Sequence, residues 1–350
     1  MASLSFNLDK LVARLPKVEL HLHLEGSVQP STLRELARRK GRFQKETEEW
    51  IVERERTACR YGAFQDFLTA FKHVTLLLDT PADYALATKD LVEWLASQNV
   101  QYAEVILAAG VILWKNQSLE AVYEAVAAAA LEAQSRMGLR VNWIFDAIRH
   151  FGPDHVREVL RYASRYRERG VVALGIGGDE GRGPARLFQE TFREARELGL
   201  HVVAHAGESV GPESIREAVE LLGAERIGHG LTAMQDPGVI AMLRSRQIPI
   251  EVCPTSNVCT GLIGRLGDHP LPRMLQEGLL VTLNSDDPAM FGTSLSAEFL
   301  GVAKEFGFSP ALLTQLSINA ARASFLTSEE KSRVEAEILK AMSDRGNLSA

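Results

Sequence analysis

Histidine and carboxylate residues stand at the ends of several short apolar runs in this chain. VELHLHL carries His21 and His23, and later runs end in HAGE with His205 and in NSDDP with Asp286. Imidazole nitrogens and a carboxylate oxygen are ligands that suit Zn²⁺, and they leave a position open for water. The residue types therefore predict a zinc centre with these four residues as its ligands.

The spacing of the first pair supports this chemistry. His21 and His23 are two residues apart, so in a strand their side chains point to the same face. Burying two imidazoles is costly unless a charged group engages them. An isolated HxH pair is equally compatible with hydrogen-bonded structural histidines, and it is the other run ends that favour a metal.

Three further residues at these run ends suit acid–base work: Glu208 in HAGE, His229 in GHG and Asp287 in NSDDP. Each also has a simpler explanation, since Glu208 would suit a helix N-terminus, Asp287 a turn, and His229 a strand-end cap. The adjacent carboxylates at 286 and 287 repel each other unless a metal or ligand binds them, and glycines leave the His229 ring open to a pocket. We therefore expect all three to serve the site, whereas His269, which has no partner motif, is expected to be an ordinary surface or packing residue.

Such a site requires a fold in which several strand ends meet. Eight β-rich runs alternate with helical patterns along the chain: VELHLHL, VQYAEVILA, LRVNWIFDAI, VVALGIG, LHVVAHAG, RIGHG, IPIEVCP and LLVTLNS. This alternation predicts a parallel sheet, and eight units predict an α/β fold of the (β/α)₈ TIM-type barrel class, with catalytic residues at the C-terminal strand ends. An open doubly wound sheet would call for a phosphate-binding loop, and GIGGDEGRG has the wrong spacing for one.

We expect a single barrel domain over residues 1–350. A helical excursion over about residues 29–97 separates the first two runs and is expected to cover the barrel mouth. A helical tail follows from Ser309. The run AVYEAVAAAALEA contains two glutamates and is too short to span a bilayer, so it predicts an amphipathic helix.

Charge and cysteine usage exclude several partners. The net charge is −6, which argues against nucleic-acid and anionic membrane surfaces because these need clustered lysine and arginine. A small-molecule ligand fits better. Three cysteines are too few for a disulfide framework and no leader pattern opens the chain, so we expect a reduced, cytoplasmic protein.

Five motifs occur in order across nearly the whole chain: KVELHLHLEGS, VVAHAGE, RIGHG, CPTSN and LNSDDPAMFGT. Together they resemble the successive signatures of the adenosine deaminase family within the amidohydrolase superfamily. The resemblance implies a zinc-dependent barrel that replaces the 6-amino group of an adenine ring by hydroxyl and releases ammonia. It implies one zinc ion, held by His21, His23, His205 and Asp286, since the strand-four end LGIGGDE lacks the lysine of two-metal relatives.

The resemblance also implies roles by matched position. Glu208 would donate a proton to purine N1, and His229 would orient the attacking hydroxide and stabilise the developing charge. Asp287 would face N7, and the backbone N–H of Gly178 would face N3. General chemistry agrees, since the aromatic C6 becomes electrophilic only as N1 is protonated.

Two positions depart from the pattern of adenosine-specific members. Glu25 stands where they have the aspartate that meets the ribose 5′-hydroxyl, and Gly175 stands where they have a second aspartate. Adenine deaminases share HLHLEG, but GGDE differs from their SSE-like strand-four end. The combination most resembles aminodeoxyfutalosine deaminases of the alternative menaquinone pathway, whose substrate carries a benzoate in place of the 5′-hydroxyl.

A substrate carboxylate calls for a cationic partner. Arg182 in GDEGRG is a candidate for substrate binding, Arg149 is a weaker one, and a solvated loop arginine is an equal explanation of Arg182. Other functions stay open, namely adenosine deaminase proper, adenine deaminase and a hydrolase of another C–N bond. A non-catalytic purine-binding barrel would be expected to lose the acid or a ligand, and all are present here.

Overall fold

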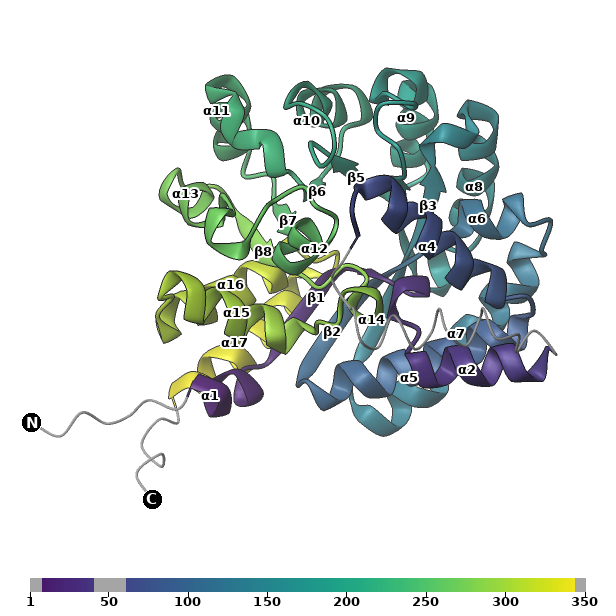
Figure 1. Cartoon of the computed structure of the whole chain (residues 1–350), viewed down its shortest axis with the longest axis horizontal. Coiled ribbons are helices and arrows are strands. Elements are labelled where there is room, and N and C mark those ends of the chain that lie inside the picture. Colours follow the sequence, from purple (N-terminus) through teal and green to yellow (C-terminus); the bar gives the residue numbers. More distant parts are fainter. Residues whose placement is uncertain (1–7, 41–60, 344–350) are drawn as a thin grey trace, which may run out of the picture.

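Eight parallel strands form the centre of the structure. The computed structural model describes residues 8–40 and 61–343, and within them the strands are β1 (Lys17–His23), β2 (Val100–Leu107), β3 (Arg140–Ile148), β4 (Val171–Gly177), β5 (His201–Ala206), β6 (Arg226–His229), β7 (Ile250–Val252) and β8 (Val281–Leu283). Each pairs with the next in sequence order. Helices surround the strands (Figure 1), so the predicted (β/α)₈ barrel is confirmed.

The barrel closes between β8 and β1 at the predicted metal ligands. The backbone N–H of His23 donates to the Asp286 carbonyl over 2.8 Å, and the Asp286 N–H donates to the His21 carbonyl over 3.0 Å. A buried side chain strengthens the same seam, since the Ser285 N–H donates to Glu19 Oε1 over 2.8 Å. The hydrogen bonds that close the barrel thus also hold the candidate ligands in place.

The last two strands are shorter than the apolar runs that predicted them. IPIEVCP is a strand only at Ile250–Val252, and LLVTLNS only at Val281–Leu283. Pro254, which has no N–H for a ladder, begins α12 (Pro254–Cys259) directly after β7. After β8 the chain turns at Asp286, whose φ of +64° is incompatible with a regular strand.

Helices cover the outside of the barrel. In addition to α12 they are α1 (Leu8–Arg14), α2 (Pro30–Arg39), α4 (Phe64–Leu77), α5 (Pro81–Ser97), α6 (Ala109–Trp114), α7 (Leu119–Met137), α8 (Pro153–Arg165), α9 (Gln189–Glu197), α10 (Glu213–Glu217), α11 (Pro237–Arg246), α13 (Leu271–Gln276), α14 (Pro288–Phe291), α15 (Leu295–Phe306), α16 (Pro310–Ala323) and α17 (Ser328–Ser343). The predicted excursion contains α2, α4 and α5, and its residues 41–60 lie outside the described residues. Within the described residues, 8–40 and 61–343, no helix is long and apolar enough to cross a bilayer.

The alanine-rich run forms the predicted helix, α7, with clear ends. Ser118 Oγ accepts the Ala121 N–H at its start, and Gly138 ends it with a left-handed φ of 72°. One face, including Val122 and Val126, is buried against the barrel. The segment is therefore amphipathic, as expected.

A buried chain of charges runs beneath the barrel mouth. The Arg226 side chain is 1% exposed and lies between two carboxylates, with Nη1 2.6 Å from Glu104 Oε2 and Nε 2.5 Å from Glu251 Oε1. Its Cζ lies 3.9 Å from the centre of the Phe325 ring. Glu251 Oε2 in turn lies 2.8 Å from His21 Nδ1, so this chain of charges reaches the candidate metal centre.

Replacing Arg226 by methionine should destabilise the protein strongly. The change leaves Glu104 and Glu251 buried without their cation, a situation that costs about 3–5 kcal/mol. Urea unfolding of R226M should show this loss. The matched surface change R244M should alter the free energy of unfolding by less than about 0.5 kcal/mol, and a loss below about 1 kcal/mol in R226M would contradict the expectation.

Candidate metal centre and catalytic pocket

Three strand ends bring the four predicted ligands to one point. His23 Nε2 lies 3.3 Å from both His205 Nε2 and Asp286 Oδ1. His21 Nε2 lies 3.5 Å from the same carboxylate oxygen. All four residues are at most 9% exposed. The ends of β1 and β5 and the segment after β8 thus assemble the predicted set.

The donor atoms of this cluster fit a metal ion. Nε2 of His21 is buried and has no hydrogen-bond partner among the described residues, which is costly unless something else binds it. Two groups of potential ligand atoms each lie within 4.8 Å of one another: His21, His205, His229 and Asp286, and His23, Asp286 and Asp287. Both groups share Asp286 and so surround one centre. The first group includes His229, which was predicted to orient the attacking hydroxide and not to coordinate the metal. The positions of the protons on the imidazole rings bear on these two roles.

His21 is held in the tautomer that a metal ligand needs. Its Nδ1 faces Glu251 Oε2 at 2.8 Å. Burial acts to raise the pKa of Glu251, but the Arg226 guanidinium and the contact with His21 together outweigh burial and lower the pKa, so the carboxylate is ionised. Nδ1 therefore carries the proton that it donates to Glu251, and Nε2 is the ring nitrogen that faces the cluster.

His229 is held in the opposite tautomer by a chain of hydrogen bonds. The Leu271 backbone N–H donates to His269 Nδ1 over 3.0 Å, so His269 Nε2 carries the ring proton and donates to Asn257 Oδ1 over 3.1 Å. The Asn257 amide then donates from Nδ2 to His229 Nδ1 over 3.2 Å. Burial lowers the pKa of His269 to about 4 and that of His229 to about 3, so both rings are neutral at pH 7. His229 Nε2 therefore carries a proton and can donate it into the pocket.

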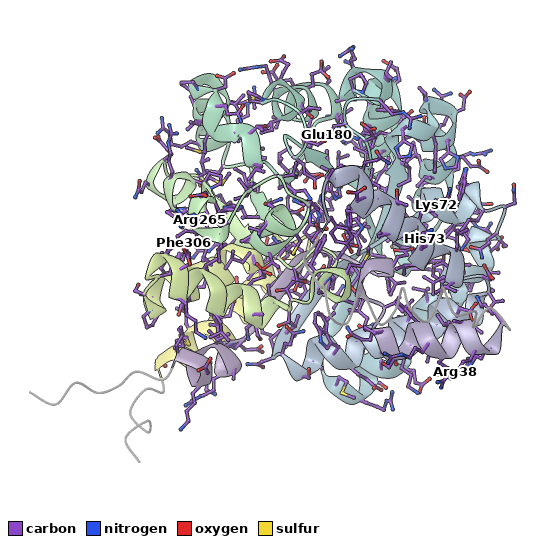
Figure 2. The ribbon with its side chains drawn as sticks, viewed as in Figure 1. Arg38, Lys72, His73, Glu180, Arg265 and Phe306 are labelled. Atoms are coloured by element: carbon purple, nitrogen blue, oxygen red, sulfur yellow. The ribbon has the colours of Figure 1, made fainter. Side chains whose placement is uncertain are left out.

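Glu208 lies opposite this donor, with Oε1 3.5 Å from His229 Nε2. Its loop is fixed by Glu180, whose carboxylate accepts the N–H groups of Gly207, Glu208 and Ser209, each over 2.9 Å. Figure 2 shows Glu180 near the end of β5. Burial, and then the charge of Asp286, raise the pKa of Glu208 well above its usual range. Burial thus favours the protonated form of Glu208, which is the form that a general acid needs.

Asp287 occupies space that a side chain at Gly26 would fill. A Cβ at Gly26 would lie 1.6 Å from Asp287 Oδ1. That oxygen has no hydrogen-bond partner among the described residues, and Asp287 lines the cavity. The glycine of the HLEG motif therefore leaves a carboxyl group available to a ligand.

Two site residues have left-handed backbone conformations, His229 with φ of 62° and Asp286 with φ of 64°. Such a conformation costs a residue other than glycine about 1–3 kcal/mol and persists only where the surroundings enforce it. Both residues follow or end a barrel strand. The turns aim their side chains at the cluster.

A cavity of about 400 Å³ opens onto the cluster, a size that suits a small molecule. Of the predicted substrate-binding residues, Gly178, Asp287 and Arg182 line it. Glu25 does not, because it is buried and its Oε1 accepts the Ala108 N–H over 3.2 Å. Contact between Glu25 and substrate stays a prediction.

Arg149 is turned away from the cavity. It is 2% exposed and donates to the carbonyl oxygens of His205 over 2.5 Å and Gly183 over 3.1 Å. These bonds tie the end of β5 to the loop after β4. The side chain holds strand ends in place and is not directed at a ligand.

The structure explains the departure at Gly175. This residue pairs with Asp146 of the neighbouring strand, and a Cβ at 175 would lie 2.8 Å from Asp146 Oδ1. Asp146 is 3% exposed, lines the cavity, and its Oδ1 has no partner among the described residues. Burial raises its pKa to about 7. At Gly175, β4 thus lacks the carboxylate that adenosine-specific members have. The Asp146 carboxylate of β3 occupies the adjoining space.

Several residues of the site were missed from the sequence. They are Asp146, Glu180, Glu251 and Asn257, together with His269, which is 3% exposed and joins the chain of hydrogen bonds to His229. Glu251 in IPIEVCP and Asp146 in LRVNWIFDAI are acids inside apolar strand runs. The same unusual feature identified His21 and His23, and it could have identified these two.

A family model described as adenosine deaminase matches residues 16–341. The chain belongs to this family. It is accordingly a hydrolytic deaminase that acts on C–N bonds.

Individual relatives of the deaminase differ in their named substrates. It is 38% identical to the aminodeoxyfutalosine deaminase of Streptomyces coelicolor, over 95% of this chain and 86% of the relative. The crystal structure of adenine deaminase from Arthrobacter aurescens superposes with a TM-score of 0.88 at 32% identity, over 94% of this chain and 99% of that one. An amidohydrolase from Burkholderia ambifaria, solved with bound zinc, has a TM-score of 0.87 at 25% identity, over 98% of this chain and 96% of that one.

Removing His269 should slow the deaminase without removing its metal. In H269A the Asn257 amide loses the partner that orients it, so His229 is free to protonate Nδ1 and to turn a lone pair toward Glu208. We expect kcat to fall roughly 10- to 100-fold, with bound metal unchanged. H269Q, which keeps a donor N–H, should recover part of the rate.

The matched control is H201Q at an exposed position paired with Glu225, which should leave kcat unaltered. Equal kcat in H269A and wild type would show that the hydrogen-bond chain does not govern His229. Metal loss in H269A would show that it supports the ligands instead.

Proposed function

We propose that the deaminase is a zinc enzyme that replaces the 6-amino group of an adenine-ring nucleoside by hydroxyl and releases ammonia. The observation that carries this proposal is the position of Glu208, whose pKa is raised by burial, opposite Nε2 of His229 in the cavity and beside the His/Asp cluster. His21, His23, His205 and Asp286 would hold one zinc ion. When bound, zinc supplies a polarised water with a pKa of about 7.

The remaining groups of the site have roles that their protonation supports. Glu208 would give its proton to purine N1, which makes C6 electrophilic as the water oxygen bonds to it. His229 would donate from Nε2 to that oxygen as negative charge develops. One proton of the water passes to the amino group and the other restores Glu208, so that the C6–N bond breaks and ammonia leaves. Asp287 would bind N7, and the N–H of Gly178 would bind N3.

For the substrate we propose 6-amino-6-deoxyfutalosine, an intermediate of the alternative menaquinone pathway, and for the location the cytoplasm. The named activity of the Streptomyces coelicolor relative supports this choice, as do Glu25 and Gly175, which depart from the adenosine-specific pattern. Arg182 lines the cavity and would bind the substrate carboxylate. Adenine is the principal competitor, because of the likeness to an adenine deaminase structure.

A substrate panel on metal-free and zinc-loaded protein tests the proposal. Chelation should abolish deamination and stoichiometric Zn²⁺ should restore it, because the buried His21 nitrogen is then bound again. Loss of adenine absorbance should be fastest with 6-amino-6-deoxyfutalosine among adenosine, deoxyadenosine, adenine and methylthioadenosine. A preference for free adenine would overturn the substrate, and full activity without metal would overturn the zinc.

Glu208→Gln should separate proton donation from binding. The amide keeps the size of the side chain but cannot release a proton to N1, so kcat should fall about 10²- to 10⁴-fold with KM little changed. Because burial raises the pKa of Glu208, wild-type activity should decline on the alkaline side as this acid deprotonates. That decline should vanish in E208Q, and its persistence there would assign it to another group.

A further inference from the structure

The cavity has an outer end that the metal centre does not use. Its wall there comes from α4, α6 and the segments after β3 and β4, and it includes Lys72, Trp114, Phe151 and Arg182. Figure 2 shows Lys72 on α4. The ligands, by contrast, come from β1, β5 and the segment after β8. A molecule bound with one end at the cluster would therefore extend toward the outer wall.

Aromatic rings line this outer wall in a fixed arrangement. Trp114 is 45% exposed although it is a large apolar side chain. Its ring stacks on Phe151, with centroids 5.9 Å apart and an interplanar angle of 14°. His150 meets Phe151 edge-on at 4.8 Å. The Trp114 side chain lines the cavity and keeps much of its surface exposed, so a planar group could stack against it, and offset stacking would stabilise binding.

Two cations stand beside the rings. Lys72 Nζ lies 5.4 Å from the centre of the Trp114 ring, and neither it nor the Arg182 guanidinium has a carboxylate partner among the described residues. The exposed Arg165, by contrast, has such a partner in Glu120. Asp179 also lines the cavity here, and it accepts the Arg182 backbone N–H over 3.2 Å. Among the described residues of this rim, two cations stand beside one carboxylate, so positive charge is in excess there.

We propose that Lys72, Trp114 and Phe151, together with Arg182, form a subsite for an aryl carboxylate at the cavity mouth. The planar ring of the ligand stacks on Trp114, and its carboxylate pairs with the Lys72 ammonium and the Arg182 guanidinium. This inference rests on the proposed function, because it assigns the end of the substrate remote from the purine. The subsite sets selectivity and takes no part in bond breaking.

Kinetics of four variants test the subsite. K72M and R182A should each raise KM for 6-amino-6-deoxyfutalosine about 10-fold, the effect of one charge-assisted contact, and W114L about 3- to 10-fold. In each, kcat should hold, because the contact is the same in ground and transition states. The KM and kcat values for adenosine, which lacks the aryl carboxylate, should stay within about twofold of wild type. W114F keeps an aromatic ring and should behave as wild type.

Surface substitution elsewhere gives the control. K304M removes a lysine that is 64% exposed and paired with Asp9, and it should change the KM of neither substrate. K72R keeps the charge and should retain most of the wild-type KM. Parallel rises in KM for both substrates in K72M and W114L would mean general damage to the cavity and would overturn the subsite.

Binding of 3-acetylbenzoate separates the subsite from the deaminase activity. This aryl carboxylate lacks a purine. It should inhibit adenosine deamination in both wild type and W114F, and it should quench Trp fluorescence in wild type but not in W114F, whereas its carboxamide should do neither. Such binding, lost in K72M, would support the subsite even if 6-amino-6-deoxyfutalosine were not deaminated. Rapid deamination of that substrate with unchanged KM in K72M and W114L, and no binding of the probe, would uphold the function and overturn the subsite.

Discussion

Closure of the barrel between β8 and β1 is the constraint on which the site depends. The hydrogen bonds across this seam join the backbone of Asp286 to those of His21 and His23, so the residues that close the sheet also supply the candidate ligands. Their side chains are brought together by sheet pairing, before any metal contributes. A parallel barrel converts strand order into proximity, and it does so here for residues more than 260 positions apart.

Two histidines of the site show how neighbours assign chemistry to the same side chain. The Nδ1 of His21 faces an ionised carboxylate, and the Nδ1 of His229 faces an amide donor. The first ring therefore presents a lone pair to the centre and the second presents a proton. Residues outside the cavity fix the orientation of both rings. For His21 the contacts lead to the Arg226 guanidinium, and for His229 to the backbone N–H of Leu271. The catalytic pocket is thus the inner end of two buried polar networks.

The fold and the ligand set could be predicted because both depend on local pattern. Strand runs alternate with helices, and the parity of His21 and His23 follows from the strand repeat alone. Residues that act through another residue could not be found this way. Glu251 contacts His21 across 230 positions, and Asp146 replaces the carboxylate expected at Gly175 only because β3 and β4 pair in that register. The sequence shows neither the pairing register nor the direction of a ring proton.

The left-handed turns at His229 and Asp286 have a consequence for how this protein responds to selection. Glycine adopts that conformation without strain, whereas histidine and aspartate do so at a cost. Variants selected for thermal stability alone would therefore gain from glycine in place of His229 or Asp286. At both positions the chain keeps a polar side chain at the cluster against the conformational preference of its backbone.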